Sequence, residues 1–373
     1  MVSAVASDIP LFKAFPLLGQ KLPYIELGSF PTPVQDLEHL ANDIGASRLF
    51  VKRDDISGHP YGGNKVRKLE FLLGEAIRRG AKEVLTFGCV GSNHCLATSV
   101  YAKQVGLGSI SMLLPQPNAY CVRDNLLANH AHGAELHLYR SMPRAALGTV
   151  RQLMQHRWKG GRWPMVIPPG GSSMPGVVGF VNAAFELKEQ IVRGEAPEPD
   201  LIYVAAGTMG TAGGLILGLK AAELKSHVVG IAVGDQRFVN ARKTLALIRK
   251  TNSFLSSFDQ SFPKCSFSES DIEIRHQFVG PGYAHFTEEG MAAVSRMQQL
   301  EGIRLEGTYT GKTLAGLVHD VTEEGRNGTI LFWNTFNSRN LTEATSDLDY
   351  HELPRCFHRY FEQNVQPLDR VGI

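Results

Sequence analysis

Segments with strand-like and helix-like patterns alternate along most of this chain, and this alternation restricts its fold more than any other feature. Short runs of apolar, often β-branched residues recur, for example at 201–206 and 329–333, and between them apolar residues return at helical spacing. Strands that alternate with helices pack as parallel strands covered by helices. The sequence therefore predicts an α/β fold, and its 373 residues leave room for two or three domains.

The patterns give approximate bounds for each element. Strands are expected at residues 48–53, 83–88, 109–114, 134–138, 165–168, 201–206, 227–233 and 329–333. Helices are expected at residues 34–42, 65–77, 92–104, 118–131, 143–157, 176–194, 237–250, 286–300 and 312–322, with one more that ends near 224. Residues 251–270 are polar and rich in serine and phenylalanine without clear periodicity, so we expect a surface insertion there.

Composition excludes several classes of protein. Lysine and arginine number 38 against 36 acidic residues, and this net charge of +2 argues against a general nucleic-acid-binding or membrane-binding surface. The five cysteines include no Cys-x-x-Cys pair, which favours reduced thiols and a cytoplasmic location over a disulfide framework. Residues 1–22 lack the pattern of a secretory signal peptide, and no apolar run is long enough to span a bilayer.

A lysine at the start of a helix is the first candidate for chemistry. The strand pattern at 47–53 is followed by a loop with the glycine pair 62–63, after which Asn64 is expected to cap a helix that begins at Lys65. The helix dipole and two more basic residues in the same turn disfavour an ammonium group there. A lysine of lowered pKa suits Schiff-base chemistry, because only the neutral amine attacks a carbonyl. A solvated lysine without a role is the alternative.

A glycine- and threonine-rich turn is the second candidate. It joins the strand at 201–206 to a helix and comprises Gly207, Thr208, Met209, Gly210 and Thr211. Backbone amides and hydroxyls at such a turn suit a phosphate group. The Gly-x-x-Gly-x-x-Gly spacing is not the dinucleotide fingerprint, and no acidic residue follows about 20 positions on. Glycines required only by a tight turn are the alternative.

Two motifs together carry a family resemblance. The segment 62–70, Gly-Gly-Asn-Lys-Val-Arg-Lys-Leu-Glu, followed by Gly-Ser-Asn-His at 91–94, resembles the pyridoxal-phosphate enzymes of the 1-aminocyclopropane-1-carboxylate deaminase and D-cysteine desulfhydrase family. The likeness runs from about Leu27 to Trp333. It implies pyridoxal 5'-phosphate as the cofactor, held covalently by Lys65.

The resemblance also implies an architecture. Family members have the tryptophan synthase β-like fold (fold-type II), with two domains that each contain a mostly parallel sheet flanked by helices. Here the large cofactor-binding domain would comprise 1–66 and 179–373, and the small α/β domain 67–178 would be inserted in it. The expected assembly is a homodimer.

The resemblance assigns the cofactor's surroundings. The turn at 207–211 would hold the cofactor phosphate, and Thr310 would meet the pyridine nitrogen. The deaminases proper have an acidic residue where Thr310 stands, whereas the D-cysteine desulfhydrase branch has threonine. A helix-capping threonine without chemistry is the alternative. The segment 307–313 is no P-loop, because three residues instead of four separate its glycines.

The resemblance assigns substrate contacts as well. Ser92, Asn93 and His94 would bind the substrate carboxylate, with Asn93 also near the cofactor's ring oxygen, while Tyr283 and Tyr309 would face the substrate. Helix capping by Ser92 is compatible with that role, and both tyrosines have the alternative of a place in the core. The implied catalytic residues are thus Lys65, Ser92, Tyr283 and Tyr309.

Some stretches depart from the family or carry weaker signals. Cys95 and Leu96 replace an arginine and a glutamine that are frequent in the desulfhydrases, and 334–338 replaces a His-Thr-Gly-Gly turn, so substrate identity stays open. The loop 168–173 resembles a family loop and is interpreted as structural. The histidines at 130, 132 and 137 straddle a helix end and a strand, so no metal site is predicted.

The function that follows is a pyridoxal-phosphate-dependent lyase or deaminase of a small amino acid. The first choice is D-cysteine desulfhydrase-like α,β-elimination, which gives a 2-oxo acid, ammonia and sulfide. Opening of 1-aminocyclopropane-1-carboxylate is the alternative within the family. A catalytically silent metabolite-binding relative and a nucleotide-dependent enzyme are alternatives of other classes. A small amino acid is the only expected partner besides a second subunit, with no nucleic acid and no membrane.

Overall fold

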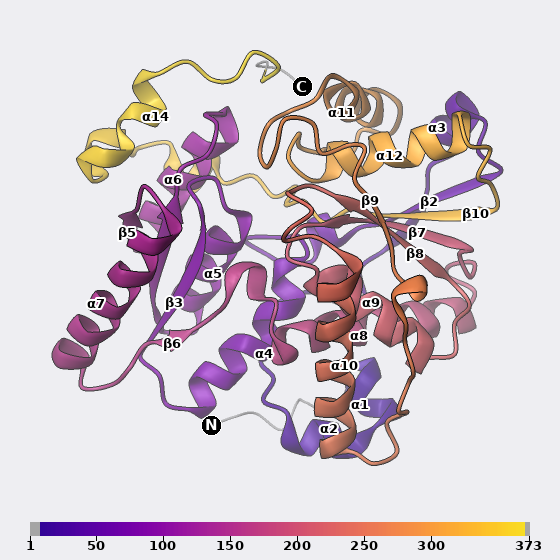
Figure 1. Cartoon of the computed structure of the whole chain (residues 1–373), viewed down its shortest axis with the longest axis horizontal. Coiled ribbons are helices and arrows are strands. Elements are labelled where there is room, and N and C mark those ends of the chain that lie inside the picture. Colours follow the sequence, from indigo (N-terminus) through magenta and orange to yellow (C-terminus); the bar gives the residue numbers. More distant parts are fainter. Residues whose placement is uncertain (1–7, 370–373) are drawn as a thin grey trace.

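Two sheets of mostly parallel strands organise the chain in a computed structural model that describes residues 8–369 (Figure 1). The larger sheet has the strand order β1-β2-β10-β7-β8-β9 and the smaller one β5-β4-β3-β6. Every neighbouring pair is parallel except β1 with β2. The strands are β1 Val34–Asp36, β2 Arg48–Lys52, β3 Glu83–Cys89, β4 Gly108–Leu114, β5 Glu135–Leu138, β6 Met165–Val166, β7 Leu201–Ala206, β8 His227–Ala232, β9 Glu273–Arg275 and β10 Thr329–Trp333.

Helices fill most of the intervals between these strands. They are α1 Pro10–Ala14, α2 Pro16–Lys21, α3 Glu38–Ile44, α4 Lys65–Arg78, α5 Asn93–Gln104, α6 Tyr120–Ala131, α7 Met142–Gly160, α8 Met174–Val192, α9 Gly210–Ala221, α10 Ala241–Phe258, α11 Glu288–Glu301, α12 Thr310–Thr322, α13 Thr342–Thr345 and α14 Arg359–Glu362. In the described part of the chain, no helix has both the length and the apolar character that crossing a bilayer requires.

Helices cover both faces of the larger sheet. Along β7, Ile202 and Val204 join one core cluster with α8, α9 and α10, whereas Tyr203 between them joins a second cluster with α3, α11 and α12. Successive side chains of a strand point to opposite faces, so a strand buried on both sides is apolar throughout. This explains the continuous apolar runs that the sequence shows in β7, β8 and β10.

The smaller sheet is enclosed in the same manner. Val84 packs with α4 and α5, while its neighbour Leu85 faces the opposite side, where Leu153 of α7 lies. The segment after β10 returns to this unit and lies beside α6, in yellow in Figure 1. There Phe357 and Tyr360 pack against Val122 of α6.

A cluster of buried charges links the larger sheet to α4 and α8. The Arg67 guanidinium of α4 lies 2.7 Å from Asp54 and 2.8 Å from Glu186 of α8. Lys52 of β2 lies 2.6 Å from Glu186, and the indole nitrogen of Trp333 in β10 donates to Asp54 at 2.8 Å. All five side chains are almost inaccessible to solvent. The cluster therefore fixes the position of α4 relative to two strands and a second helix.

The α/β class with two mostly parallel sheets is confirmed, and most predicted strands and helices lie within a few residues of their expected bounds. Three predictions are wrong in detail. Residues 34–42 are not one helix, because β1 pairs with β2 before α3 begins. Residues 251–258 are the last turns of α10, and α12 begins at Thr310, two residues before its expected start. Residues 1–7, the first part of the segment 1–22 that lacks a signal-peptide pattern, lie outside the described part.

Replacement of Arg67 by methionine should destabilise the protein by about 3–5 kcal/mol, because it leaves two buried carboxylates with too little compensating charge. The measurement is the free energy of unfolding from urea titration. Arg193→Met is the matched control, since it removes an exposed arginine that pairs with Glu195. The control should unfold at the wild-type urea concentration. Equal midpoints for both variants would contradict a role of the cluster in holding α4.

Candidate active site

The loop before α4 is held in place by the segment that follows β10. Gly63 has a positive φ of 87°, and a Cβ there would lie 3.0 Å from the carbonyl oxygens of Thr335 and Phe336. The Gly62 amide donates to the Asn337 side chain at 2.7 Å. A Cβ on Gly62 would lie 2.1 Å from the Asp55 carbonyl oxygen, so close backbone contact requires glycine at both positions. The departure from the family at 334–338 thus has a structural role beside the lysine loop.

Lys65 lies at the first position of α4 and is partly buried. Its Nζ donates to Asn64 Oδ1 at 3.0 Å. Burial lowers the pKa of Lys65 to about 8, against the opposing charge of Glu306. Sequence reasoning predicted the lowered pKa but attributed it to the helix dipole and neighbouring cations. The structure gives burial as the main cause, since Arg67 is engaged by two carboxylates.

The predicted capping role of Asn64 is wrong. Its side chain makes no capping bond to α4. Instead Asn64 Nδ2 donates to Thr211 Oγ1 at 3.0 Å, 147 positions away in sequence. This bond brings the lysine loop to the glycine- and threonine-rich turn at 207–211.

The turn at 207–211 joins β7 to α9 and has the features of an anion site. Met209 precedes α9 with a positive φ of 64°, and no side chain caps this helix. Thr208 Oγ1 accepts a hydrogen bond from Ser172 at 2.8 Å. A Cβ on Gly210 would lie 2.4 Å from the same serine hydroxyl and 2.8 Å from Lys68 Nζ. The first amides of α9 and an ammonium group therefore meet at one place, as a phosphate requires.

Lys68 is a site residue that sequence reasoning missed. It is buried one turn after Lys65, and its Nζ donates to the Gly170 carbonyl at 3.1 Å. Burial and then the charge of Lys65 hold the pKa of Lys68 well below its ordinary value. The i, i+3 spacing of the two lysines was the available signal. The loop 168–173, interpreted as structural, lies against this site through Gly170 and Ser172.

These residues fit pyridoxal phosphate. Lys68 Nζ bonds to a neutral carbonyl oxygen, so a phosphate dianion beside it would favour the charged form of Lys68 and offset that charge. Gly210 leaves a cradle that any side chain would fill. Asn64 links the Lys65 amine to Thr211 of the same turn, and this primary amine has the lowered pKa that covalent attachment of an aldehyde requires.

The start of α5 carries the three predicted substrate contacts. Ser92 Oγ caps the helix by accepting from the Cys95 amide at 3.2 Å. Asn93 Oδ1 accepts from Asn125 at 3.0 Å, which fixes its orientation. Burial, and then the charges of the two site lysines, hold the pKa of His94 well below its ordinary value. The buried His94 ring is neutral, and its Nε2 lies 2.9 Å from the hydroxyl of Thr86, which holds the ring at the start of α5.

The two predicted tyrosines lie together beside the turn. The hydroxyls of Tyr283 and Tyr309 are 2.5 Å apart. A Cβ on Gly207 would lie 3.6 Å from the Tyr309 ring, which places this ring at the candidate phosphate site. Burial raises the pKa of both phenols, so both are protonated and share one short hydrogen bond.

Glu306 is the second residue that sequence reasoning missed. Its carboxylate accepts hydrogen bonds from the amides of Thr308, Tyr309 and Thr310 at 2.8–2.9 Å and so caps α12. Burial raises the pKa of Glu306, although these amides oppose the shift. Thr310 is therefore the first residue of the helix and not its cap, and its hydroxyl accepts from the Glu306 amide at 3.0 Å.

Residues 282–286, which we call the tyrosine loop because they include Tyr283, are connected to α6 by residues 360–369, which we call the C-terminal strap. Gln366 Oε1 accepts from the Phe286 amide at 2.7 Å, and its Nε2 donates to the Ala284 carbonyl at 3.2 Å. The Gln366 amide donates to the Asn118 carbonyl at 2.9 Å. One residue thus holds the backbone next to Tyr283 and the segment before α6.

The histidines that could suggest a metal bind separate groups. His130 lies 3.5 Å from Glu352, and His137 lies 2.6 Å from Glu135. His132 Nδ1 contacts a backbone carbonyl of its own helix. The three side chains therefore do not share a common centre.

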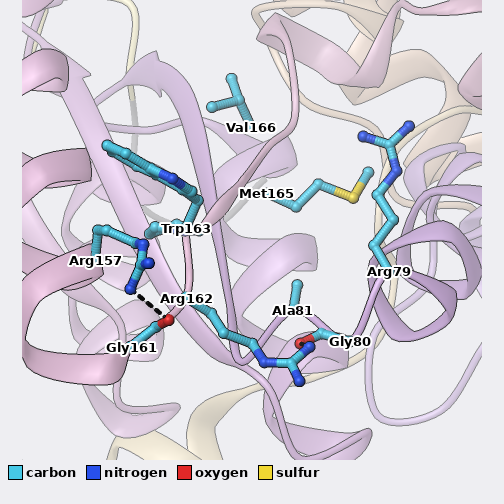
Figure 2. A pocket seen from close by; sticks show the side chains of 10 residues that line it. Arg79, Gly80, Ala81, Arg157, Gly161, Arg162, Trp163, Met165 and Val166 are labelled. Carbon is cyan, nitrogen blue, oxygen red and sulfur yellow. Dashed lines mark hydrogen bonds between the residues drawn. The ribbon is translucent and has the colours of Figure 1, made fainter.

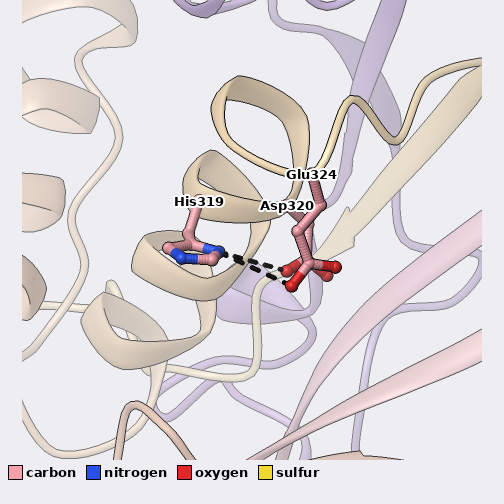
Figure 3. A group of neighbouring side chains, drawn as sticks. All are labelled: His319, Asp320 and Glu324. Atoms are coloured by element: carbon pink, nitrogen blue, oxygen red, sulfur yellow. Dashed lines mark ion pairs between the residues drawn. The ribbon is translucent and has the colours of Figure 1, made fainter.

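A different group, His319, Asp320 and Glu324 at the end of α12, has metal-like spacing (Figure 3). Its carboxylates are already paired with arginines. Arg275 lies 3.0 Å from Asp320 and contacts Glu324, and Arg326 lies 3.5 Å from Glu324. The group is therefore part of an ion-pair network at the surface of the larger sheet.

Comparisons with known proteins agree with this site. The family model described as pyridoxal-phosphate dependent enzyme matches residues 25–335. A putative 1-aminocyclopropane-1-carboxylate deaminase of Pyrococcus horikoshii is 36% identical over 328 residues, which cover 87% of this chain and 94% of the relative. D-cysteine desulfhydrase of Klebsiella pneumoniae is 33% identical over 322 residues, 84% of this chain and 94% of the relative.

Comparison with solved structures supports the same family and fold. A crystal structure of an ACC deaminase homologue matches with a TM-score of 0.74 and 34% identity, and covers 89% of this chain and 98% of that one. A fungal L-serine ammonia-lyase from Rhizomucor miehei matches with a TM-score of 0.57 at 20% identity, covering 86% and 98%, and shows the fold alone. The predicted resemblance, including its extent, is therefore confirmed.

The Lys65 amine of the cofactor-free chain should become reactive between pH 7 and 9. An amine is charged below its pKa and neutral above it, so a pKa of about 8 gives a neutral fraction of about a tenth at pH 7 and about nine-tenths at pH 9. The measurement is acetylation by trace acetic anhydride with peptide mapping, with the exposed Lys82 as internal reference. A rate that still rises above pH 10 would contradict the burial of Lys65.

Gln366→Ala should loosen the tyrosine loop, because it removes both side-chain bonds to residues 284–286. Since one hydrogen bond contributes about 1 kcal/mol, exchange of the Phe286 amide proton is expected to accelerate about five-fold or more. The measurement is hydrogen exchange by mass spectrometry. Gln363→Ala is the matched control, because Gln363 contributes its backbone carbonyl to Arg123. Equal exchange in the two variants would refute the role of the Gln366 side chain.

Proposed function

This chain belongs to the pyridoxal-phosphate dependent enzyme family, in its 1-aminocyclopropane-1-carboxylate deaminase and D-cysteine desulfhydrase group, and we propose that it eliminates the β-substituent of a small amino acid. The preferred substrate is D-cysteine, with sulfide, ammonia and a 2-oxo acid as products. We further propose a homodimer of subunits that each divide into a domain of 1–66 and 179–373 and an inserted domain of 67–178.

The cofactor, when bound, supplies an electron sink conjugated with the α-carbon of the substrate. We assign covalent attachment to Lys65 and binding of the phosphate to the turn at 207–211. Lys68 and the first amides of α9 support this assignment, because they place hydrogen-bond donors at the turn and a phosphate there would favour the charged form of Lys68. We assign to Thr310 the contact with the pyridine nitrogen of the cofactor.

The substrate is bound and deprotonated by residues of three segments. The start of α5, with Ser92 and Asn93, receives the substrate carboxylate next to the neutral His94. Lys65 Nζ takes the α proton, which its lowered pKa permits because a sizeable fraction of the amine is neutral near pH 8. The hydroxyls of Tyr283 and Tyr309 lie 2.5 Å apart and stay protonated, and we assign to them a hydrogen bond that stabilises the departing thiolate.

The observation that carries the choice of substrate is Thr310. Its hydroxyl is neutral and fully buried, and it is held by the Glu306 amide at 3.0 Å. The nearby Glu306 carboxylate is occupied by three backbone amides. A neutral group does not favour a protonated ring nitrogen, so less electron density is withdrawn from the substrate. A substrate with a good leaving group, such as a thiolate, then reacts more readily than a strained ring of carbons.

The wild-type enzyme should release sulfide from D-cysteine faster than it opens 1-aminocyclopropane-1-carboxylate. The matched variant combines Thr310→Glu with Glu306→Gln, so that one carboxylate stands at position 310 without a second beside it. The ratio of kcat/KM for the two substrates should shift toward the cyclopropane in this variant. The measurements are sulfide release and 2-oxo acid formation. Faster wild-type turnover of the cyclopropane than of either cysteine enantiomer would refute the proposal.

Borohydride reduction of the bond between lysine and cofactor, followed by peptide mapping, tests which lysine holds the cofactor. The label is expected on Lys65, and Lys65→Ala should lose it. A label on Lys68 or Lys312 would overturn the assignment of the base while leaving the family unchanged. A yellow, labelled protein without turnover of any amino acid would favour a silent metabolite-binding relative.

A further inference from the structure

Helix α7 exposes most of its large apolar residues, with Leu153 partly buried against the smaller sheet, and its fully buried residues are small or polar. The residues that face the smaller sheet include Ala145, Gly148, Gln152 and His156. The outward residues include Leu147, which is 75% exposed, and Trp158, which is 92% exposed. This is the reverse of the pattern that stabilises a surface helix of a globular protein. The outer face of α7 is therefore built for contact with something other than water.

The exposed apolar residues form a continuous stripe. Leu147, Val150, Met154 and Trp158 follow one another at intervals of three or four residues, so they share one face of the helix. Trp163 and Val166 are exposed just beyond its end. Seven of the twelve exposed large apolar residues within 8–369 lie between 142 and 166, a concentration that marks an interaction surface. In Figure 1, α7 lies at the outer edge of the molecule, on the side away from the larger sheet.

Basic residues border this stripe. On a helix with 100° between residues, Arg144 and Arg151 lie along one side of the stripe and Arg157 along the other, and all three are exposed. Residues 136–185 contain five arginines and one lysine but no aspartate or glutamate. This segment therefore carries six positive charges in a chain whose net charge is +2. Glu83 and Glu135, which both contact His156 of α7, are acidic residues beside this segment. The small net charge therefore conceals a predominantly basic surface.

A cavity of about 630 Å³ adjoins the end of the stripe (Figure 2). Arg79, Arg157, Arg162, Trp163 and Met165 are among its lining residues. Arg157 donates to the Gly161 carbonyl at 2.5 Å and Arg162 to the Gly80 carbonyl at 2.9 Å, which fixes the two guanidinium groups at the rim. Guanidinium groups beside an indole ring suit a phosphate ester at a boundary between water and apolar groups.

Charge decides which partner fits this surface. A second copy of the chain that paired through α7 would bring two predominantly basic surfaces together, so self-association there is disfavoured. An apolar stripe with tryptophan, bordered by arginine, is typical of helices that lie in the plane of a membrane interface. We propose that the outer face of α7 binds an anionic phospholipid bilayer. The stripe enters the interface, and the arginines bind lipid phosphates on either side and in the cavity.

The test is sedimentation of the purified full-length holoenzyme with vesicles. Vesicles of phosphatidylcholine with about a third phosphatidylserine should bind it, vesicles of phosphatidylcholine alone should not, and high salt should release it. Arg144→Gln/Arg151→Gln should weaken binding about five-fold for each arginine removed. Leu147→Ser/Trp158→Ser should weaken it further. Val192→Ser/Phe238→Ser, which changes exposed apolar residues elsewhere, is the matched control and should bind as the wild type does.

Two outcomes would overturn the proposal. One is equal binding of the Leu147→Ser/Trp158→Ser variant and the control, or no binding of the wild type to anionic vesicles. The other is a wild-type oligomer in sedimentation velocity that this variant dissociates, because the stripe would then be a subunit interface. Wild-type turnover of the soluble substrate by every variant is the check that each has folded.

Discussion

The buried contact of Arg67 with Asp54 and Glu186 is the interaction on which the arrangement of the site depends. With Lys52, which also contacts Glu186, four charged side chains are removed from water. Their large desolvation penalty is offset only when every charge has partners in the correct geometry. The need for this geometry fixes the position of α4 relative to β2 and α8. Lys65 lies two residues before Arg67 and Lys68 one after it, so the same contact places both site lysines.

Basic and acidic side chains lie on different sides of the site. On one side, burial leaves the two lysines and the neutral His94 with oxygen partners that carry no charge, and this favours an anionic ligand. On the other side, the Glu306 carboxylate accepts hydrogen bonds from the amides at the start of α12 and from the hydroxyl of Thr310. The helix terminus thus takes up a negative charge that would otherwise repel a phosphate-bearing ligand.

Periodicity predicted most of the fold because buried parallel strands are apolar on both faces and most helices keep one apolar face. It failed at 251–258, where the buried side of α10 includes Thr251 and Asn252 and so hides the helical pattern. Motifs located Lys65 and the turn at 207–211. Local patterns carry no information on contacts between residues that are far apart in sequence. Three such contacts are the hydrogen bonds of Asn64 with Thr211, of Lys68 with Gly170 and of Gln366 with Phe286.

The C-terminal strap has a consequence for biosynthesis. Gln366 follows every strand of both sheets in the sequence, yet it holds the loop that positions Tyr283. During translation, the two sheets and the lysine loop are therefore available before the tyrosine loop is fastened. A chain that ends before Gln366 lacks the two side-chain bonds to residues 284–286, so the backbone next to Tyr283 is among the last parts of the site to be fastened.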